Sequence, residues 1–255
     1  MLTVRVVKIG GNELDRPTWV ADCARALQRA GSIVVVHGGG RAVSEWSQRL
    51  GLPVEKRDGM RVTTPEIAEL VEMVLSGPIN RVLVSALRAA GLDAIGLSGV
   101  DGGLLTARVR ADLGEVGEIV SVRGSLLQSL LLAGLTPVVA PVAPSGAAPT
   151  RPLNVNADQA AAAIAAALDA QELLFVSDVP GVTIDGMSQP TLAAAEIEPM
   201  IETGVASGGM AAKLRAAGLA LQAGVRAVRI GDLDMLEHAT AGTRLLAAPP
   251  AVQPA

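Results

Sequence analysis

The chain has 255 residues and a formal net charge of −4. Hydrophobic residues make up 50% of it, but aromatic residues only 1%. The length suits one large α/β domain, or two lobes that share a sheet, with a core of aliphatic side chains. The negative charge argues against nucleic acid or an anionic membrane as a partner. Cys23 is the only cysteine, which excludes an intrachain disulfide and a multi-cysteine metal site. With no signal peptide and no uncharged apolar run of membrane-spanning length, we expect a cytoplasmic protein with no membrane partner.

The chain begins with a predicted strand over 3–8, which leads into the glycine turn Gly10-Gly11 and then into a helix over 17–30. Lys8 therefore lies at the carboxyl end of a strand, beside backbone that can approach a ligand closely. Open α/β sheets bind their ligands at this edge. A lone lysine is often a solvated charge, so the position of Lys8 alone leaves open whether it binds a ligand or is simply solvated.

Residues 34–40, which read VVVHGGG, form the most informative stretch. Three β-branched residues predict a buried strand, three glycines follow, and an amphipathic helix is expected over 41–50. Glycine N–H groups at the start of a helix can bind an anion. A tight turn without a ligand is the alternative, but three successive glycines favour a binding site. The stretch lacks both the phosphate-loop motif of nucleotide hydrolases and the G-x-G-x-x-G spacing of dinucleotide-binding proteins.

A charged segment over 54–62 follows this helix and allows two interpretations. It could be a solvated hairpin, or it could present Arg61 to a ligand. A guanidinium can hold a carboxylate with two parallel hydrogen bonds, so Arg61 is the better ligand candidate. Thr64 is the predicted N-cap of a helix over 65–76, and a second helix is expected over 79–90.

A trio of polar residues ends the middle part of the chain. We expect before it strands over 93–98 and 136–142, a strand or hairpin arm over 116–122, a helix over 125–133 and a mobile surface loop over 144–152. Asn154, Asn156 and Asp158 alternate, so they share one side of an extended backbone. Asp158 caps or opens an alanine-rich helix that continues to 167, and a plain N-cap is its simplest role. A cap does not explain the two amides, so a binding role for the trio is favoured.

The C-terminal part holds a second glycine-rich helix start. We expect a strand over 172–177, a loop or hairpin tip over 183–189, helices over 192–202 and 211–223, a strand over 225–230 and a disordered tail after 246. Lys213 lies in the first turn of the second predicted helix, where the helix dipole disfavours a cation. This placement suggests an anionic ligand, with a solvated lysine as the alternative. A boundary between two lobes is expected near Ala170.

Several motifs stand in one order along nearly the whole chain. They are VKIGG at 7–11, VHGGG at 36–40, GMRVT at 59–63, NVNAD at 154–158, SDVPG at 177–181, and SGGM at 207–210 with Lys213. With these motifs the chain resembles the amino acid kinase family and, within it, the acetylglutamate kinases. The lysine–glycine start is common to the wider family, whereas GMRVT and NVNAD are the more specific motifs. The resemblance implies an α/β fold, a three-layer αβα sandwich with a mainly parallel central sheet.

The resemblance also implies an activity. The protein would use ATP to phosphorylate the side-chain carboxylate of N-acetyl-L-glutamate, which gives N-acetylglutamyl 5-phosphate in arginine biosynthesis. An N-terminal lobe, 1–170, would bind the acyl amino acid and form the dimer, and a C-terminal lobe, 171–255, would bind ATP with Mg²⁺. No dense carboxylate cluster is visible in the sequence, so no metal-binding residue is predicted and the nucleotide would hold most of the metal's coordination.

Individual residues receive roles from the same resemblance. Lys8 and Lys213 would be the transition-state cations, and Asp158 would orient them. The residues that would hold acetylglutamate are Gly39, Gly40, Arg61, Asn154 and Asn156. Those that would line the nucleotide site are Gly10, Gly11, Asp178, Val179, Pro180, Gly181, Val182, Thr183, Val205, Ala206, Ser207 and Gly209.

The chemistry of this reaction agrees with the residue types present. A carboxylate nucleophile is already ionised at neutral pH, so it needs no general base. The chain contains only two histidines, His37 and His238, and His37 is interpreted as structural. Two lysines and glycine N–H groups can supply the positioning and charge neutralisation that phosphoryl transfer needs.

Two other functions fit the same fold. One is a kinase for aminoadipate attached to an acidic carrier protein in lysine biosynthesis, although a net charge of −4 argues mildly against such a partner. The other is a non-catalytic amino-acid sensor, which would not need both Lys8 and Lys213. Arginine-inhibited relatives carry an extra N-terminal helix that links dimers into a hexamer, and only Met1 and Leu2 precede the first strand here. We therefore expect a homodimer that arginine does not inhibit.

Overall fold

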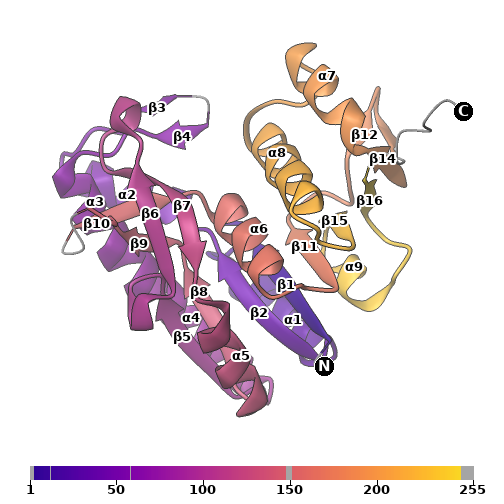
Figure 1. Cartoon of the computed structure of the whole chain (residues 1–255), viewed down its shortest axis with the longest axis horizontal. Coiled ribbons are helices and arrows are strands. Elements are labelled where there is room, and N and C mark those ends of the chain that lie inside the picture. The colour runs from indigo at the N-terminus through magenta and orange to yellow at the C-terminus, as the bar shows by residue number, and fades with distance from the viewer. Residues whose placement is uncertain (1–2, 12, 58, 148–150, 248–255) are drawn as a thin grey trace, which may run out of the picture.

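The computed structural model describes residues 3–11, 13–57, 59–147 and 151–247. These residues form a large sheet, a smaller sheet and the helices around them (Figure 1). The disordered tail expected after 246 lies almost wholly outside the described residues, and so does the centre of the expected mobile loop, at 148–150.

The main sheet has eight strands among the described residues, in the order β14-β16-β15-β11-β1-β2-β8-β5. From β15 to β5 each strand is parallel to its neighbour, whereas β16 is antiparallel to β15. Valine, isoleucine and leucine dominate the central strands because both faces of a parallel sheet are buried. The bounds are β1 Val4–Ile9, β2 Ser32–His37, β5 Ala94–Ser98, β8 Thr136–Ala140, β11 Glu172–Val176, β14 Thr191–Ala193, β15 Val228–Gly231 and β16 Thr243–Leu246. The predicted mainly parallel sheet is confirmed.

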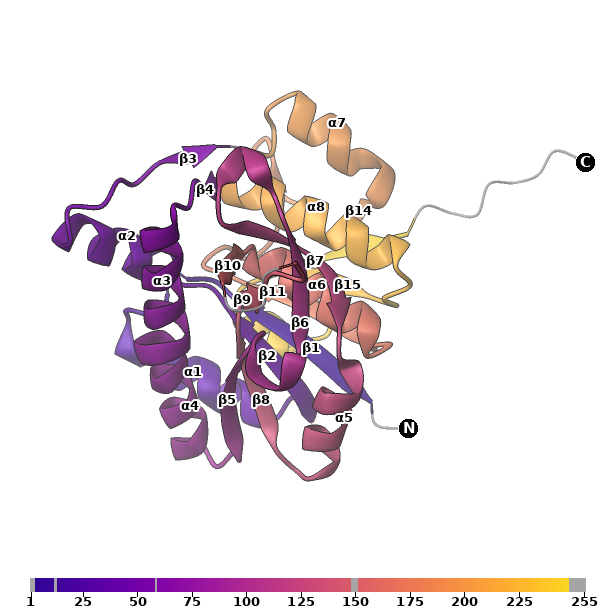
Figure 2. The ribbon, with the colours of Figure 1, turned by 60° about the vertical axis from the view of Figure 1, so that its left-hand side comes forward.

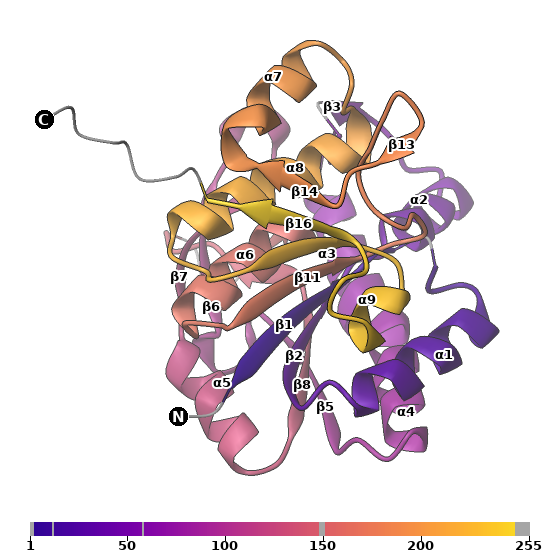
Figure 3. The same ribbon diagram turned by 90° about the vertical axis from the view of Figure 1, so that its right-hand side faces the viewer.

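Helices cover both faces of this sheet (Figure 3). Successive residues of a strand point to opposite faces, so Val6 packs in the core under α6 and α8, while Val7 packs in the core under α1 and α4. The first face carries α5 Gly124–Leu132, α6 Ala157–Ala167 and α8 Gly208–Gln222, and the second carries α1 Pro17–Gln28, α4 Asn80–Ala89 and α9 Asp234–Glu237. The three-layer αβα sandwich expected from the sequence is confirmed.

A second sheet, which the sequence did not predict, packs against α6. Its strands in spatial order are β6 Leu105–Val109, β7 Val116–Val122, β10 Pro152–Val155 and β9 Val142–Pro144, with 3₁₀ turns at Asp101–Gly103 and Ala111–Leu113. The single strand expected over 136–142 is divided at Pro141 into β8 and β9. β7 confirms the strand expected over 116–122. The other three strands are short and depend on their pairing partners, so a local pattern does not identify them.

Helices α2 and α3 and the hairpin between them complete the N-terminal half. Their bounds are α2 Gly40–Arg49, β3 Lys56–Arg57, β4 Met60–Arg61 and α3 Pro65–Val74. The Thr64 hydroxyl accepts a hydrogen bond from Ile67 N at 3.4 Å, so the predicted N-cap is confirmed. The segment over 54–62 does form a hairpin, but its Arg61 is buried rather than solvated.

A wide helical turn, Leu75–Ile79, joins α3 to α4. Gly77 leaves helical geometry there, with φ −89° and ψ −110°, and Pro78 follows it. The joined stretch Pro65–Ala89 is long and apolar enough to cross a membrane by length and composition alone. In this fold it is a bent pair of helices that packs on α2, α1 and the strands β5 and β8.

The C-terminal part differs from its prediction at two elements. The helix expected over 192–202 is β14, a 3₁₀ turn Ala194–Glu196 and the short helix α7 Ile197–Glu202, because β14 pairs with β16. Helix α8 begins at Gly208, so Lys213 lies in its second turn and the dipole argument for a ligand at Lys213 does not hold. The segment expected to be a loop or a hairpin tip is a hairpin of β12 Thr183–Ile184 and β13 Met187–Ser188.

The main sheet is continuous across the expected lobe boundary near Ala170, because β11 pairs with β1. The two halves also meet where the start of β4 lies beside the start of α8 (Figure 2). A Cβ added to Gly59 would lie 3.8 Å from Gly208 O. The division into lobes at 1–170 and 171–255 stays a prediction.

Candidate active site

A cavity of about 300 Å³ opens at the carboxyl ends of the central parallel strands. In-register pairing of β1 with β2 and with β11 places the ends of these strands side by side. The turns that follow them, Gly10-Gly11, 38–40 and Ser177-Asp178, all line the cavity. This is the edge at which the sequence predicted a ligand site.

The first two of these turns are in backbone contact. Gly38 N donates to Ile9 O at 3.0 Å, and a Cβ added to Gly11 would lie 3.0 Å from Gly39 Cα. A side chain at Gly11 would therefore push the two turns apart. Glycine at this position lets both backbones line the cavity.

Helix α2 begins at the cavity and has no side-chain cap, because its N-cap residue is Gly39. Val43 N donates to Gly39 O at 3.0 Å, and the N–H groups before it have no acceptor within an α-helix. The positive end of the helix dipole favours an anion at this place. We refer to residues 38–40 and the start of α2 as the glycine cradle.

A buried histidine holds the glycine cradle from behind. His37 Nδ1 lies 2.8 Å from Gly38 O, and its Nε2 lies 3.1 Å from Asn80 Nδ2. Burial lowers the pKa of His37 to about 4, so the ring is neutral, Nδ1 donates to Gly38 O and Nε2 accepts from Asn80. The C=O and N–H of a trans peptide point in opposite directions, so this bond turns the Gly39 N–H away from His37. The geometry agrees with the expected structural role.

Lys8 and Lys213 reach the cavity from two different elements. Lys8 points to the face of β1 that α6 covers, and its Nζ lies 2.7 Å from Asp158 Oδ1, with side chains only 7% and 9% exposed. Lys213, on α8, makes no ion pair with any described residue. Burial lowers the pKa of Lys213, and the charge of Lys8 lowers it further, while Asp158, Glu13 and Asp178 act in the opposite direction. One lysine is therefore neutralised in place and the other is not.

Asp158 is not the cap of α6, although its sequence position allowed that role. The cap is Asn156, whose Oδ1 accepts from Asp158 N at 2.8 Å and from Gln159 N at 3.1 Å. The Asp158 carboxylate is left for Lys8. Asn154 also lines the cavity, and its Nδ2 donates to Thr63 Oγ1 at 3.1 Å. All three residues line the cavity, each with a different task, and the binding role of the trio stays a prediction.

Arg61 connects the β3–β4 hairpin to the glycine cradle. Its Nη2 donates to Gly40 O at 2.9 Å and to Ser44 Oγ at 2.6 Å. Its buried Nη1 has no hydrogen-bond partner among the described residues. Burial lowers the pKa of this guanidinium, which stays a cation at neutral pH. Arg61 therefore has one N–H group free for a carboxylate in the cavity.

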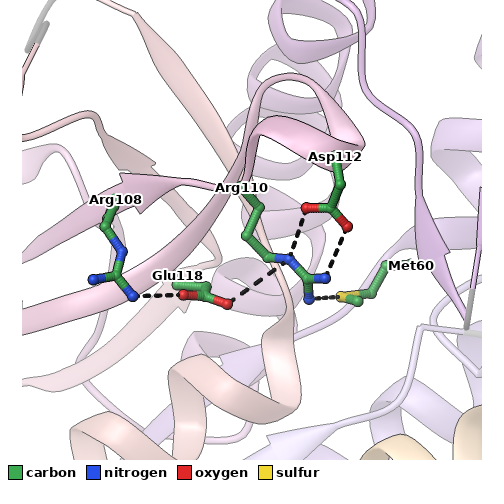
Figure 4. A network of polar contacts seen from close by, with 5 residues as sticks. All are labelled: Met60, Arg108, Arg110, Asp112 and Glu118. Atoms are coloured by element: carbon green, nitrogen blue, oxygen red, sulfur yellow. Dashed lines mark hydrogen bonds and ion pairs between the residues drawn. The ribbon is translucent and has the colours of Figure 1, made fainter.

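Arg110 lines the same cavity and belongs to a network of ion pairs at its edge (Figure 4). Its guanidinium lies 3.0 Å from Asp112 Oδ2 and 3.7 Å from Glu118 Oε1, and its Nη1 lies 3.6 Å from Met60 Sδ. Through Met60 it contacts the β3–β4 hairpin. Sequence reasoning missed Arg110 because the strand that positions it, β6, was not predicted.

Sequence reasoning also missed Glu13 and Ser177, which line the cavity as well. Glu13 is 2% exposed and Ser177 is 5% exposed. Glu13 Oε2 and Ser177 Oγ lack a hydrogen-bond partner within the described ranges. For Glu13 the available signal was a carboxylate two residues after the Gly10-Gly11 turn.

The residues expected at the nucleotide lie in two groups. Gly10, Gly11, Asp178 and Gly209 line the cavity. Val182 and Ala206 have buried side chains in the core, so only their backbone could contact a ligand. The cavity lining does not include these two or Val179, Pro180, Gly181, Thr183, Val205 and Ser207. The roles of all these residues stay predictions.

The described residues contain no group of three or more His, Cys, Asp or Glu side chains that could hold a metal ion by itself. The acidic side chains of the cavity that are not paired with a lysine are Glu13 and Asp178. Mg²⁺ is commonly held by one or two carboxylates together with phosphates and water. The donors present therefore fit a metal that arrives with a nucleotide.

Comparison with known proteins relates the chain to one family. Residues 3–232 match the model of the amino acid kinase family. An acetylglutamate kinase from Chloroflexus aurantiacus is 47% identical over 249 residues, which cover 96% of this chain and 97% of that protein. An acetylglutamate kinase from Methanopyrus kandleri is 44% identical over 246 residues, with coverage of 91% and 96%. The solved structure of a protein from Streptococcus mutans UA159 has a TM-score of 0.85 and 28% identity, and the match covers 96% of this chain and 99% of that chain.

Proposed function

The chain belongs to the amino acid kinase family, and we propose that it transfers the γ-phosphoryl group of ATP to the side-chain carboxylate of N-acetyl-L-glutamate. The product is N-acetylglutamyl 5-phosphate, an intermediate of arginine biosynthesis. Similarity to acetylglutamate kinases over nearly the whole chain supports this substrate. The observation that carries the reaction is one cavity that joins the glycine cradle, the Lys8–Asp158 ion pair and the unpaired Lys213.

Arg61 and Asn154 bind the acyl amino acid. The free Nη1 of Arg61 can donate to the α-carboxylate. Asn154 uses its Nδ2 on Thr63, which leaves its carbonyl oxygen to accept from the acetamido N–H. The N–H groups of Gly39 and Gly40 then face the phosphoryl group that is transferred. The end of the cavity with Arg61 and Asn154 is called the acyl end below.

The reaction needs positioning and charge neutralisation more than proton transfer. An oxygen of the side-chain carboxylate forms the new bond to Pγ, the bond from Pγ to the β,γ-bridging oxygen breaks, and ADP leaves with that electron pair. Lys8 and Lys213 stabilise the negative charge on the phosphoryl oxygens, and Asp158 positions Lys8. His37 does not act as a base, because both ring nitrogens are engaged in hydrogen bonds.

The nucleotide lies at the other end of the cavity, near Asp178, Gly209 and Lys213. We call this part the nucleotide end. Mg²⁺ bound with ATP supplies positive charge to the β- and γ-phosphates. Mg²⁺ prefers oxygen ligands, and this chain can offer it the oxygen atoms of Glu13, Ser177 and Asp178.

An assay of phosphoryl transfer tests the proposal. Purified protein is incubated with MgATP and N-acetyl-L-glutamate, and the acyl phosphate is trapped as the hydroxamate. Free glutamate, aspartate and aminoadipate are the control substrates, and we expect product only with acetylglutamate. A preference for aminoadipate, or no product with acetylglutamate, would show that the substrate assignment is wrong. Retention of Lys8, Lys213 and Asp158 in one cavity argues against a non-catalytic sensor.

The assembly we propose is a homodimer. Met73 on α3 and Val82 on α4 are 53% and 50% exposed, so an apolar surface is available on these helices. Two-fold pairing is the commonest closed assembly of soluble proteins. Light scattering should give twice the chain mass of 25.9 kDa, and a monomer would contradict the proposal. A cytoplasmic location and insensitivity to arginine stay predictions.

A further inference from the structure

Two ionic side chains that line the cavity, Glu13 and Lys213, form no ion pair with any described residue. Lys213 makes no ion pair and Glu13 Oε2 accepts no hydrogen bond within the part of the chain that the structure describes. The remaining buried pair, Lys8 and Asp158, is already neutralised. A buried charge without a counter-charge is unfavourable. The charges that lack a partner in the protein therefore indicate which charges the ligand carries. It must present one positive and one negative group.

The backbone of the first glycine turn fixes the position of Glu13. Arg16 N donates to Glu13 O at 3.1 Å, which closes the turn before α1. The carboxyl group lies over Gly10, where an added Cβ would come within 3.3 Å of Glu13 Cδ. Glu13 therefore presents its carboxylate at the carboxyl end of β1, and a residue larger than glycine at position 10 would displace it.

A second polar atom without a partner lies at the end of the neighbouring strand. Ser177 follows β11, which pairs with β1, and its buried Oγ has no hydrogen-bond partner among the residues described. Asp178 comes next and lines the same cavity. A carboxylate, a hydroxyl and a second carboxylate are thus gathered at adjacent strand ends. Hard oxygen donors of this kind suit Mg²⁺, which keeps several waters and completes its shell with phosphate oxygens.

Lys213 is the other group that could neutralise Glu13, but its side chain runs along its own helix. A Cβ added to Gly209 would lie 3.8 Å from Lys213 Nζ, and no ion pair joins Lys213 to Glu13 in the described residues. A direct pair with Glu13 would also withdraw Lys213 from the phosphates. MgATP satisfies both groups, because its metal suits Glu13 and its phosphates suit Lys213.

We propose that Glu13 is the side chain that binds the Mg²⁺ ion of MgATP, or one of its water molecules, with Ser177 and Asp178 as supporting oxygen donors. The inference rests on the proposed function, since the nucleotide provides the remaining ligands. Its consequence is selectivity for the metal complex. Without the metal, the carboxylate of Glu13 repels the phosphates, so free ATP binds poorly.

Calorimetric titration with a non-hydrolysable ATP analogue tests this without any turnover. The quantity of interest is the ratio of affinities in Mg²⁺ and in EDTA, compared for wild type and Glu13→Gln. We expect Glu13→Gln to lower that ratio by about 10- to 100-fold, the usual effect of losing a metal-positioning group. The variant should bind more weakly in Mg²⁺ and more tightly in EDTA than wild type does. Asp22→Asn, which removes one charge from an exposed position on α1, should leave the ratio unchanged.

The assignment is wrong if Glu13→Gln changes the affinity for the nucleotide in the same direction in Mg²⁺ and in EDTA. If Glu13 only paired with Lys213, its loss would change binding in the same direction with and without metal, and the ratio would stay within about twofold. Glu13→Asp keeps the charge but withdraws it by one methylene, so it should lower the ratio less than Glu13→Gln does. It also replaces Glu13→Gln if that variant does not fold, and an unchanged ratio in Glu13→Asp together with Ser177→Ala then overturns the assignment.

Mn²⁺ gives a readout of the metal itself. In the complex with ADP and wild-type protein, the electron paramagnetic resonance signal of Mn²⁺ should broaden relative to Mn²⁺–ADP alone, and Glu13→Gln should reduce this change. Wild-type protein that binds no adenine nucleotide would contradict the proposed function as well. Wild-type protein with metal-dependent nucleotide binding that Glu13→Gln leaves intact would overturn only the role of Glu13.

Discussion

The acyl end and the nucleotide end of the cavity differ in whether their polar side chains have hydrogen-bond or ionic partners in the protein. At the acyl end, Arg61 and Asn154 are held by hydrogen bonds to neighbouring atoms, His37 holds the glycine cradle from behind, and Nη1 of Arg61 is left for the ligand. At the nucleotide end, Glu13 and Lys213 have no partner among the described residues. The acyl end is therefore preorganised, which lowers the entropic cost of binding a small flexible substrate. The nucleotide end is completed by its ligand, which makes it dependent on the charge of that ligand.

The two lysines give the strongest test of this difference. Lys8→Ala and Lys213→Ala should each lower turnover by about 100- to 1,000-fold, more than they weaken ATP binding, because each removes a preorganised positive charge. Only Lys8→Ala should also lower the free energy of unfolding, by about 3–5 kcal/mol, since it leaves Asp158 buried and unpaired. Turnover and urea unfolding of both variants check this. Equal losses of stability would mean that Lys213 is paired after all, and near-normal turnover of either variant would remove it from the reaction.

Acid should weaken the glycine cradle through His37. Burial lowers its pKa from 6.5 to about 4, so the unfolded state takes up the proton first as the pH falls. The contribution of neutral His37 is complete above pH 6.5 and is lost as the pH falls toward 4, by about 3 kcal/mol of unfolding free energy. Urea unfolding at pH 7 and pH 4 measures it.

The control for this test is the other histidine. His37→Asn should remove the acid-dependent loss, whereas His238→Asn, at an exposed position, should keep it. The same pH dependence in wild type and His37→Asn would show that His37 is not the responsible group.

Asp158→Asn should lower turnover by about 100-fold, because the position of Lys8 is no longer held by charge. Helix α6 should persist, since its cap is Asn156 and not Asp158. The stability loss should be smaller than that of Lys8→Ala, because an amide oxygen can still accept a hydrogen bond from Lys8. Circular dichroism and kcat distinguish the outcomes, and normal kcat would leave Asp158 with a structural role only.

The smallest expected effect lies at the acyl end. Arg61→Lys should raise the KM for acetylglutamate by about tenfold while ATP affinity changes little, because lysine keeps the charge but loses the fork that contacts Gly40, Ser44 and the substrate. Initial rates over a range of each substrate measure the two constants. An effect on ATP alone would move Arg61 to the nucleotide end.

Local signals were sufficient for the central part of the fold. Valine-rich strands followed at once by glycine turns identified β1 and β2 and placed Lys8 and the glycine cradle at one edge, because parallel strands share the direction of their ends. The N-cap at Thr64 and the hairpin that carries Arg61 followed from residue chemistry as well. These features depend on neighbours within a few residues.

Features that depend on distant partners were not predictable in the same way. The strands β6 and β9 were not predicted as separate strands, because each is stabilised by pairing with another strand, β6 with β7 and β9 with β10. Asn156 and Asp158 are both good cap residues, and only the start of α6 decides between them. That Glu13 is buried and lacks a partner is a property of the folded chain, because it depends on which side chains fail to reach it. For the same reason the sequence did not show that α8 begins at Gly208 rather than at 211, which places Lys213 in the second turn of the helix.

The position of β1 in the sheet has a consequence for synthesis on the ribosome. This first strand lies between β2 and β11, and β11 begins about 170 residues after β1 does. At common rates of translation, roughly 10 to 30 seconds pass before β11 is made. During this interval the nascent chain holds a central strand with one unpaired edge, which exposes it to aggregation and to chaperone binding. The sheet is therefore incomplete until β11 is made, and a ribosome that stalls before Glu172 leaves a fragment in which β1 lacks one of its two partners.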